Sequence, residues 1–286
     1  MKINHLPLLN GDEVSARLAA LAGGVADAVA ELLNRHDDDD EPPVIRWHSG
    51  DLRLPAFFPD EHDGHDYDYL IVDGDVIVEG CLAVSPQRED GGIVVLGRLQ
   101  ADTLICWGGL VVRDDVRIRH AYCSSGNDGA FVVGGDLTAL TLVEAGEFIH
   151  VHGDLDARCL ASLQNFVQVD GETRCDCRID SAQSEDLIKR MFAPCLLKAF
   201  EGMDNDGQRI VGWYPDDDAY LACLRQGRSP LRRGDGRLAC HAPGTAPDAA
   251  RPPVLAPSVL QSMGLGSFMC AISPRGWAAP FASSVE

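Results

Sequence analysis

The sequence predicts a mainly β fold: a single-stranded parallel β-solenoid of about six coils with flanking α-helical caps. Three observations predict it: six segments align with one another, one column of the alignment is always valine, and neighbouring columns alternate between apolar and charged residues. The segments read LIVDGDV, IVVLGRL, LVVRDDV, FVVGGDL, IHVHGDL and VQVDGET, and they begin at Leu70, Ile93, Leu110, Phe131, Ile149 and Val167.

The alternation predicts which way the side chains point. The reference column holds Gly74, Gly97, Asp114, Gly135, Gly153 and Gly171, and the column two residues earlier holds Val72, Val95, Val112, Val133, Val151 and Val169. The column just after the reference is charged throughout, with Asp75, Arg98, Asp115, Asp136, Asp154 and Glu172. Period-two alternation, β-branched residues and a glycine indicate a short strand with one bend. We therefore expect the valines to face inward and the charged column to face water.

The spacing of the segments favours a solenoid over an open α/β sheet. Successive reference positions are 23, 17, 21, 18 and 18 residues apart, a period typical of stacked repeats. Parallel strands in an α/β sheet need a crossover of a dozen or more residues, usually a helix, and these gaps are too short for one.

Four parts are expected along the chain. Residues 1–44 form an N-terminal helix, from about Asp12 to Arg35, and an acidic linker. Residues 45–180 form the β-solenoid, in which the apolar side chains of 45–69 cover the first coil. Residues 181–232 form a C-terminal helical cap with a short helix over about 217–226, and residues 233–286, rich in alanine and proline, form a disordered tail. Helical covers at both ends argue against end-to-end growth of the stack.

The charge predicts a basic partner. The formal net charge is −20, and residues 61–180 hold 22 acidic and 8 basic side chains, a net charge of −14. Such a surface repels nucleic acid and anionic membranes and attracts basic proteins, although acidity that serves only solubility predicts the same composition. No apolar run is long enough to span a membrane. The start of the chain shows no secretion signal, so a cytoplasmic location is expected.

Of the ten cysteines, those stacked in two columns of the repeat are interpreted as small apolar residues with a structural role. Cys106 and Cys123 share one column of the repeat, and Cys159 and Cys177 share another. Cys175 and Cys177 form a C-x-C pair, which could bind a metal or react with oxidants, but no second pair at a zinc-ligand spacing accompanies it.

Few residues offer chemistry. His150, His152, Gln168 and Asp170 are expected to form an outward polar patch that could bind a ligand, a metal or a partner, or perform acid–base chemistry, and a hydrated surface predicts the same residues. The segment from His62 to Asp68 resembles a metal site only in composition. His120 and Cys123 near a bend could pair as base and nucleophile. The sequence lacks phosphate-loop, nucleophile-elbow and zinc-protease motifs, so no catalytic residue, metal or cofactor is assigned.

The repeated coils of LIVDGDV, FVVGGDL and IHVHGDL resemble the bactofilins, bacterial cytoskeletal proteins that polymerise and have a right-handed β-solenoid fold. The resemblance covers roughly residues 66–180 and implies fold more than function. Bactofilins resemble a bare solenoid with short tails, whereas this chain has helical segments on both sides. The pattern also resembles the solenoid immunity proteins of bacterial polymorphic toxin systems.

Three functions follow as hypotheses. The first is a non-enzymatic, immunity-like protein that docks a basic partner on its acidic face and occludes the partner's active site. The second is a bactofilin-like structural protein that self-associates into a polymer. The third is a polysaccharide-type lyase or hydrolase using the outward His/Asp patch. The first is preferred, and its expected docking residues are Asp75, Asp115, Asp136, Asp154 and Glu172, joined by His150, His152, Gln168 and Asp170.

Overall fold

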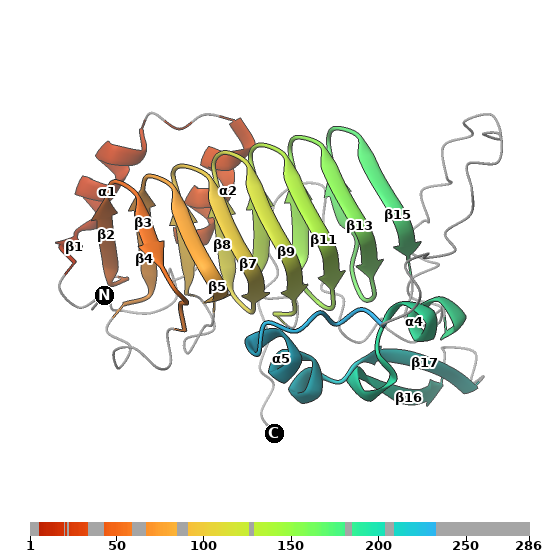
Figure 1. The fold of residues 1–286 in the computed structure, drawn as a ribbon. Coiled ribbons are helices and arrows are strands. Elements are labelled where there is room, and N and C mark those ends of the chain that lie inside the picture. The colour runs from red at the N-terminus through yellow and green to blue at the C-terminus, as the bar shows by residue number, and fades with distance from the viewer. Residues whose placement is uncertain are drawn as a thin grey trace, which may run out of the picture. The chain divides into compact units, whose positions relative to one another are not determined.

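The computed structural model is a β-solenoid of stacked parallel strands (Figure 1). It describes residues 6–19, 21, 23–33, 43–58, 67–84, 91–125, 129–180, 185–203 and 209–232. The chain forms two compact units, of which the first comprises Met1–Ala199 and Gly212–Ala242 and contains the solenoid. The predicted tail at 233–286 lies outside the described residues.

Two sheets make up the solenoid. An eight-stranded sheet, here called the short sheet, runs in the order β1 (Leu8–Leu9), β2 (Ile45–Ser49), β4 (Tyr69–Asp73), β6 (Gly92–Val95), β8 (Gly109–Val112), β10 (Ala130–Val133), β12 (Phe148–Val151) and β14 (Val167–Val169). A seven-stranded sheet, the long sheet, holds β3 (Leu52–Leu54), β5 (Val76–Val84), β7 (Leu99–Cys106), β9 (Val116–Cys123), β11 (Leu137–Glu144), β13 (Leu155–Ser162) and β15 (Thr173–Ile179). Each coil therefore contributes two strands, and the reference glycine lies at the corner between them.

The strand register confirms the sequence alignment. Leu70 pairs with Ile93, Phe131 with Ile149, and Leu137 with Leu155, so equivalent positions of successive repeats are neighbours. The valine column is fully buried from Val72 to Val151, and it forms the centre of the core between the sheets. The cysteine columns are also as predicted, because Cys106 pairs with Cys123 and Cys159 with Cys177.

Within the described residues, the solenoid contains one coil more than the six predicted. Strands β2 and β3 continue the register upstream, with Arg46 beside Leu70 and His48 beside Val72 in the inward columns. These polar residues are tolerated because the coil is the first of the stack. Arg46 is buried, and its Nη1 donates a hydrogen bond to the carbonyl of Leu6 at 2.8 Å. The segment that we expected to cover the first coil is therefore itself a coil.

The predicted N-terminal helix is two helices, α1 (Gly11–Leu18) and α2 (Gly23–Leu33). The helical conformation is interrupted before α2, where Gly23 has a φ of +66°, a left-handed conformation that favours glycine. Helix α2 packs on the outer face of the short sheet rather than across the end of the stack. Its Val25, Val29 and Leu32 join an apolar cluster with outward residues of the strands, namely Ile71, Val94, Val111 and Val132.

The C-terminal helices also flank the solenoid along a side. Helix α4 (Glu185–Met191), a 3-10 turn at Pro194–Leu196 and α5 (Asp217–Arg225) pack on the outer face of the long sheet. Asp216 caps α5, because its side chain accepts the N–H of Ala219 at 3.1 Å. Residues 197–200, expected in a helical segment, lie in β16 (Leu197–Met203), which pairs with β17 (Arg209–Pro215).

The last coil remains partly open, contrary to the prediction that a helix closes it. In the inward columns of β14 and β15, Val167, Val169 and Cys175 are only half-buried and Thr173 is exposed. The equivalent positions of the preceding coil, Ile149, Val151 and Leu155, are fully buried. Helical flanks alone therefore do not argue against growth at this end.

Candidate functional site

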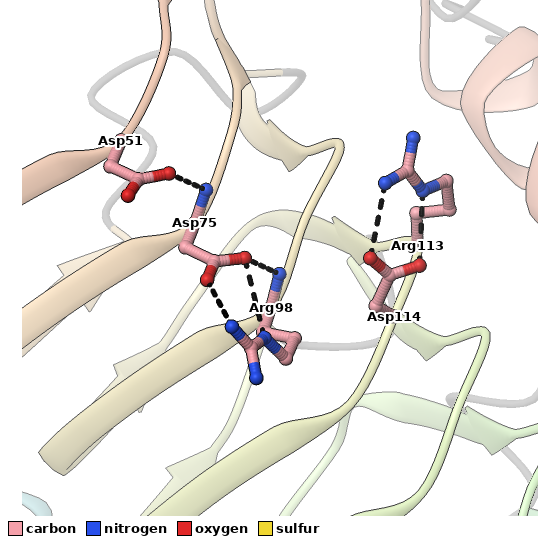
Figure 2. Close-up of polar contacts among 5 residues, drawn as sticks. All are labelled: Asp51, Asp75, Arg98, Arg113 and Asp114. Carbon is pink, nitrogen blue, oxygen red and sulfur yellow. Dashed lines mark hydrogen bonds and ion pairs between the residues drawn. The ribbon is translucent and has the colours of Figure 1, made fainter.

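The charged column forms a ladder of hydrogen bonds along the corner of the solenoid, here called the carboxylate edge. In each step an aspartate Oδ1 accepts the backbone N–H of the equivalent residue in the next coil. The donor–acceptor distances are 3.0 Å for Asp51 and Asp75, 2.8 Å for Asp75 and Arg98, 3.1 Å for Asp115 and Asp136, 2.8 Å for Asp136 and Asp154, and 2.9 Å for Asp154 and Glu172. Figure 2 shows the steps from Asp51 to Arg98.

The glycine column makes room for this ladder. A Cβ at Gly153 would lie 2.4 Å from Asp136 Oδ1 and 2.5 Å from the carbonyl oxygen of Gly135, and neither distance is tolerable. The one reference position that is not glycine, Asp114, supports the same reasoning. The glycine is replaced by Asp114 only in the coil that follows Arg98, the one residue of the charged column without an acceptor oxygen. An aspartate in the charged column of one coil therefore requires glycine in the reference column of the next coil.

Arginines neutralise part of the carboxylate edge. Arg98 forms an ion pair with Asp75 at 2.7 Å, and Arg174 contacts both Asp154 and Glu172 at 2.8 Å. The hydrogen bond from the Arg98 side chain lowers the pKa of Asp75. The pKa of Asp154 is lowered by the backbone N–H of Glu172 and by Arg174.

Asp115 and Asp136, like Asp51 in the first coil, differ from Asp75, Asp154 and Glu172, which form ion pairs with arginines. The side chains of Asp115 and Asp136 are exposed, and within the described part of the chain neither forms an ion pair with an arginine or lysine, although Arg98 of the preceding coil interacts with Asp115 at longer range. Each carboxylate is held in place by one backbone N–H of the next coil. The column was predicted simply to face water, whereas the structure gives one oxygen of each ladder aspartate a structural role.

The histidine patch forms as the register predicts. His150 and His152 project outward from β12 and its corner, and His150 lies beside Gln168 of β14. His150 Nε2 is 3.1 Å from Asp170 Oδ1, and His152 Nδ1 is 2.8 Å from Asp170 Oδ2. The two imidazole rings are 4.1 Å apart between centroids. The hydrogen bonds from both histidines, that of His150 first, lower the pKa of Asp170 to about 2.

Helix α2 begins beside this patch. A Cβ at Gly24 would lie 2.3 Å from Cε1 of His152, so the imidazole ring rests on the glycine. The outward column of the short sheet is apolar under the helix, from Ile71 to Val132, and becomes polar at His150, beside the first residues of the helix. The patch therefore occupies the first outward positions that α2 leaves uncovered.

The proposed pairing of His120 with Cys123 is wrong. Both residues are fully buried, and Cys123 lies in the inner core. His120 instead places Nδ1 2.9 Å from the hydroxyl of Thr141 on the neighbouring strand. Burial raises the pKa of the Cys123 thiol well above its ordinary value and lowers the pKa of His120 to about 4. A thiolate nucleophile activated by this imidazole is therefore excluded.

The remaining metal hypotheses gain no support. Cys175 and Cys177 contact different apolar clusters, Cys175 the inner core and Cys177 the outer one, so their thiols do not converge. In the segment EHDGHDYDY, His62, Asp63, His65 and Asp66 lie outside the described residues. Asp68 has a structural contact, because its Oδ2 accepts the backbone N–H of Val44 at 2.7 Å.

Sequence reasoning missed the positions on which the helices dock. The outward residues Ile71, Val94, Val111 and Val132 form a continuous apolar column, and Ile105, Tyr122 and Val143 form another on the long sheet. The signal was present, because the outward position of the short sheet is apolar in four successive repeats, where a water-facing strand would be polar. That column predicts a covering element and could have located α2.

No protein-family profile, curated protein or solved structure matches this chain. The β-solenoid fold therefore rests on the repeat and the structure alone. Within the described ranges, no helix has the length and apolar character needed to cross a bilayer.

Proposed function

We propose that this chain is a non-enzymatic protein-binding β-solenoid that docks a basic protein partner on the carboxylate edge. The observation that carries the proposal is the pair Asp115 and Asp136, two exposed carboxylates fixed in adjacent coils that form no ion pair among the described residues. Neighbouring strands are about 4.8 Å apart, so the two charges lie close together.

The surroundings of this pair favour a cationic partner. In the seven coils, the three corner positions hold nine acidic residues and two arginines, a net charge of −7. Such a field accelerates encounter with a basic protein and weakens as salt is added. Because each ladder oxygen is held by the backbone, little side-chain entropy is lost on docking. An immunity-like role, in which the solenoid occludes the partner's active site, is part of this proposal.

The test must separate the charge of the edge from its structural oxygen. Lysine at these positions would remove both, whereas asparagine removes the charge and keeps an acceptor for the next coil. We therefore compare the double variant Asp115→Asn/Asp136→Asn with Asp27→Asn/Glu31→Gln on α2, which removes two charges elsewhere. Partners are captured from a lysate by each form and quantified by mass spectrometry, and candidates are then purified for titration.

The proposal expects a basic protein that binds the unmodified chain and the α2 control but is depleted at least tenfold on the edge variant. Its affinity measured with purified components should also fall as the salt concentration rises. Equal retention by both variants would contradict docking on this edge, and so would a partner whose binding does not depend on salt.

A second candidate is a bactofilin-like structural protein that polymerises, and the half-buried last coil favours it. Among the described residues, β14 and β15 are the outermost strands of their sheets at this end, and such edges are templates on which another copy can continue the sheets. Light scattering and negative-stain microscopy across salt concentrations distinguish the two functions. Filaments support polymerisation, whereas a discrete monomer or dimer at all concentrations contradicts it.

A further inference from the structure

The histidine patch has the composition and spacing of a metal site. One ligand atom each from His150, His152 and Asp170 can be chosen so that all lie within 4.8 Å of one another. Around a tetrahedral zinc ion with bonds of about 2.0–2.2 Å, ligand atoms are separated by about 3.3 Å. The two imidazole–carboxylate distances of 3.1 and 2.8 Å are already near this value. Small side-chain rotations are therefore enough to place the three donors around one cation.

The hydrogen bonds of the patch compete for one ring nitrogen. His150 Nε2 lies 3.1 Å from Asp170 Oδ1, which only accepts, and 3.1 Å from Gln168 Nε2, which only donates. A single ring nitrogen cannot donate to the first and accept from the second at the same time. A bound cation removes this conflict with the carboxylate, because the lone pairs of the imidazole and of Asp170 then point to the same ion. Rotation of the Gln168 amide would present its oxygen as a further ligand.

The backbone holds the donors in place. His150 and His152 belong to one coil, and Asp170 follows β14 in the next, so their separation is set by the pairing of β12 with β14. His152 is fixed further by Gly24, which leaves no space for a Cβ beneath the ring. Coordination through Nδ1 places the ring proton on Nε2, a buried atom that has no hydrogen-bond partner within the described ranges. A metal-bound histidine normally donates that proton, so we expect exchangeable binding rather than a permanent structural site.

From these contacts we propose that His150, His152 and Asp170 bind a divalent transition-metal cation of the zinc type, with water in the remaining positions. Two imidazole nitrogens favour Zn²⁺, Co²⁺, Ni²⁺ and Cu²⁺ over Mg²⁺ and Ca²⁺, which prefer sets of oxygen ligands. The cation joins the last coil to the coil before it. It therefore stabilises the half-buried end of the solenoid, in addition to any docking on the carboxylate edge.

The proposal is tested with the full chain after treatment with a chelator. Zn²⁺ is titrated by calorimetry, and Co²⁺ is followed by its visible absorption, for the unmodified protein, His152→Ala and Asp170→Asn. His48→Ala is the matched control, since it removes an imidazole from the first coil, far along the stack from the patch. The histidines outside the described residues are present in all four proteins, so any Zn²⁺ that they bind is the same background in each. Differences between the unmodified protein and the patch variants therefore report on the patch.

We expect His152→Ala and Asp170→Asn each to weaken the site at least tenfold, while His48→Ala leaves it unchanged. Zn²⁺ should raise the Tm of the unmodified chain, and Mg²⁺ at the same concentration should not. Asp170→Asn preserves shape, so it remains informative if the alanine variant fails to fold. Identical Zn²⁺ stoichiometry and affinity in the unmodified chain and in Asp170→Asn would overturn the proposal.

Discussion

Asp136 is predicted to stabilise the solenoid mainly through an oxygen atom rather than through its charge. Its Oδ1 accepts the backbone N–H of Asp154 at 2.8 Å. A hydrogen bond to a charged group contributes about 1.5–3 kcal/mol, and we take the lower value because Asp136 is exposed. Asp136→Ala should therefore destabilise the fold by about 1.5 kcal/mol. Asp136→Asn keeps a neutral acceptor of roughly half the strength, so its cost should be about 0.7 kcal/mol.

The comparison of these two variants removes the effect of net charge, because both delete one negative charge from an acidic protein. The free energy of unfolding is measured in urea at fixed pH and salt. Asp156, an exposed residue of β13 outside the ladder, gives the control pair Asp156→Asn and Asp156→Ala. That pair should differ by no more than about 0.5 kcal/mol. If Asp136→Ala were as stable as Asp136→Asn, the ladder would contribute nothing and our reasoning about the glycine column would fail as well.

Two further predictions concern single positions in the stack. The folded-state pKa of His120, lowered by burial to about 4, lies below the ordinary value of 6.5. His120 therefore contributes stability above pH 6.5 that is lost as the pH falls toward 4, up to about 3 kcal/mol, and His120→Thr should flatten urea-unfolding stability across this range. Arg98→Asp should destabilise the fold, because the side chain of Asp114 occupies the space that the new carboxylate of residue 98 needs for its bond to the next coil. The additional change Asp114→Gly should restore stability. Additive effects of these two changes in a double-mutant cycle would contradict coupling between the columns.

The core of the solenoid could be predicted because every repeat reports the same geometry. Inward valines, corner glycines and the cysteine columns all follow from the alternation, and the register places them as expected. The first coil escaped recognition because Arg46 and His48 occupy its inward columns. Those residues lie at the end of the stack, where β2 pairs with the two-residue strand β1 and not with a further coil. Prediction from the repeat pattern is therefore weakest for the first and last coils of the stack.

The role of the helices could not be derived from periodicity alone. The amphipathic pattern before the solenoid predicts an apolar helix face but not the surface on which that face packs. Close packing decides it: a Cβ at Gly109 would lie 2.1 Å from Leu32, and one at Gly134 would lie 2.6 Å from Val25. These contacts join residues that are more than seventy positions apart in the chain. The histidine patch was predictable, in contrast, because its members are related by the register of adjacent coils.

The acidity of the edge has two separable origins. A ladder that needs an acceptor at each corner accumulates aspartates whatever the protein binds, so the charged column alone is weak evidence for a partner. Asp73, at the corner position before the glycine, is exposed and takes no part in the side-chain ladder. The ladder that stabilises the fold therefore does not require the negative charge of Asp73. Replacing ladder aspartates by asparagine preserves the oxygen that the fold uses and removes the charge that a partner would recognise. A loss of binding without a matching loss of stability would therefore assign the charge to function.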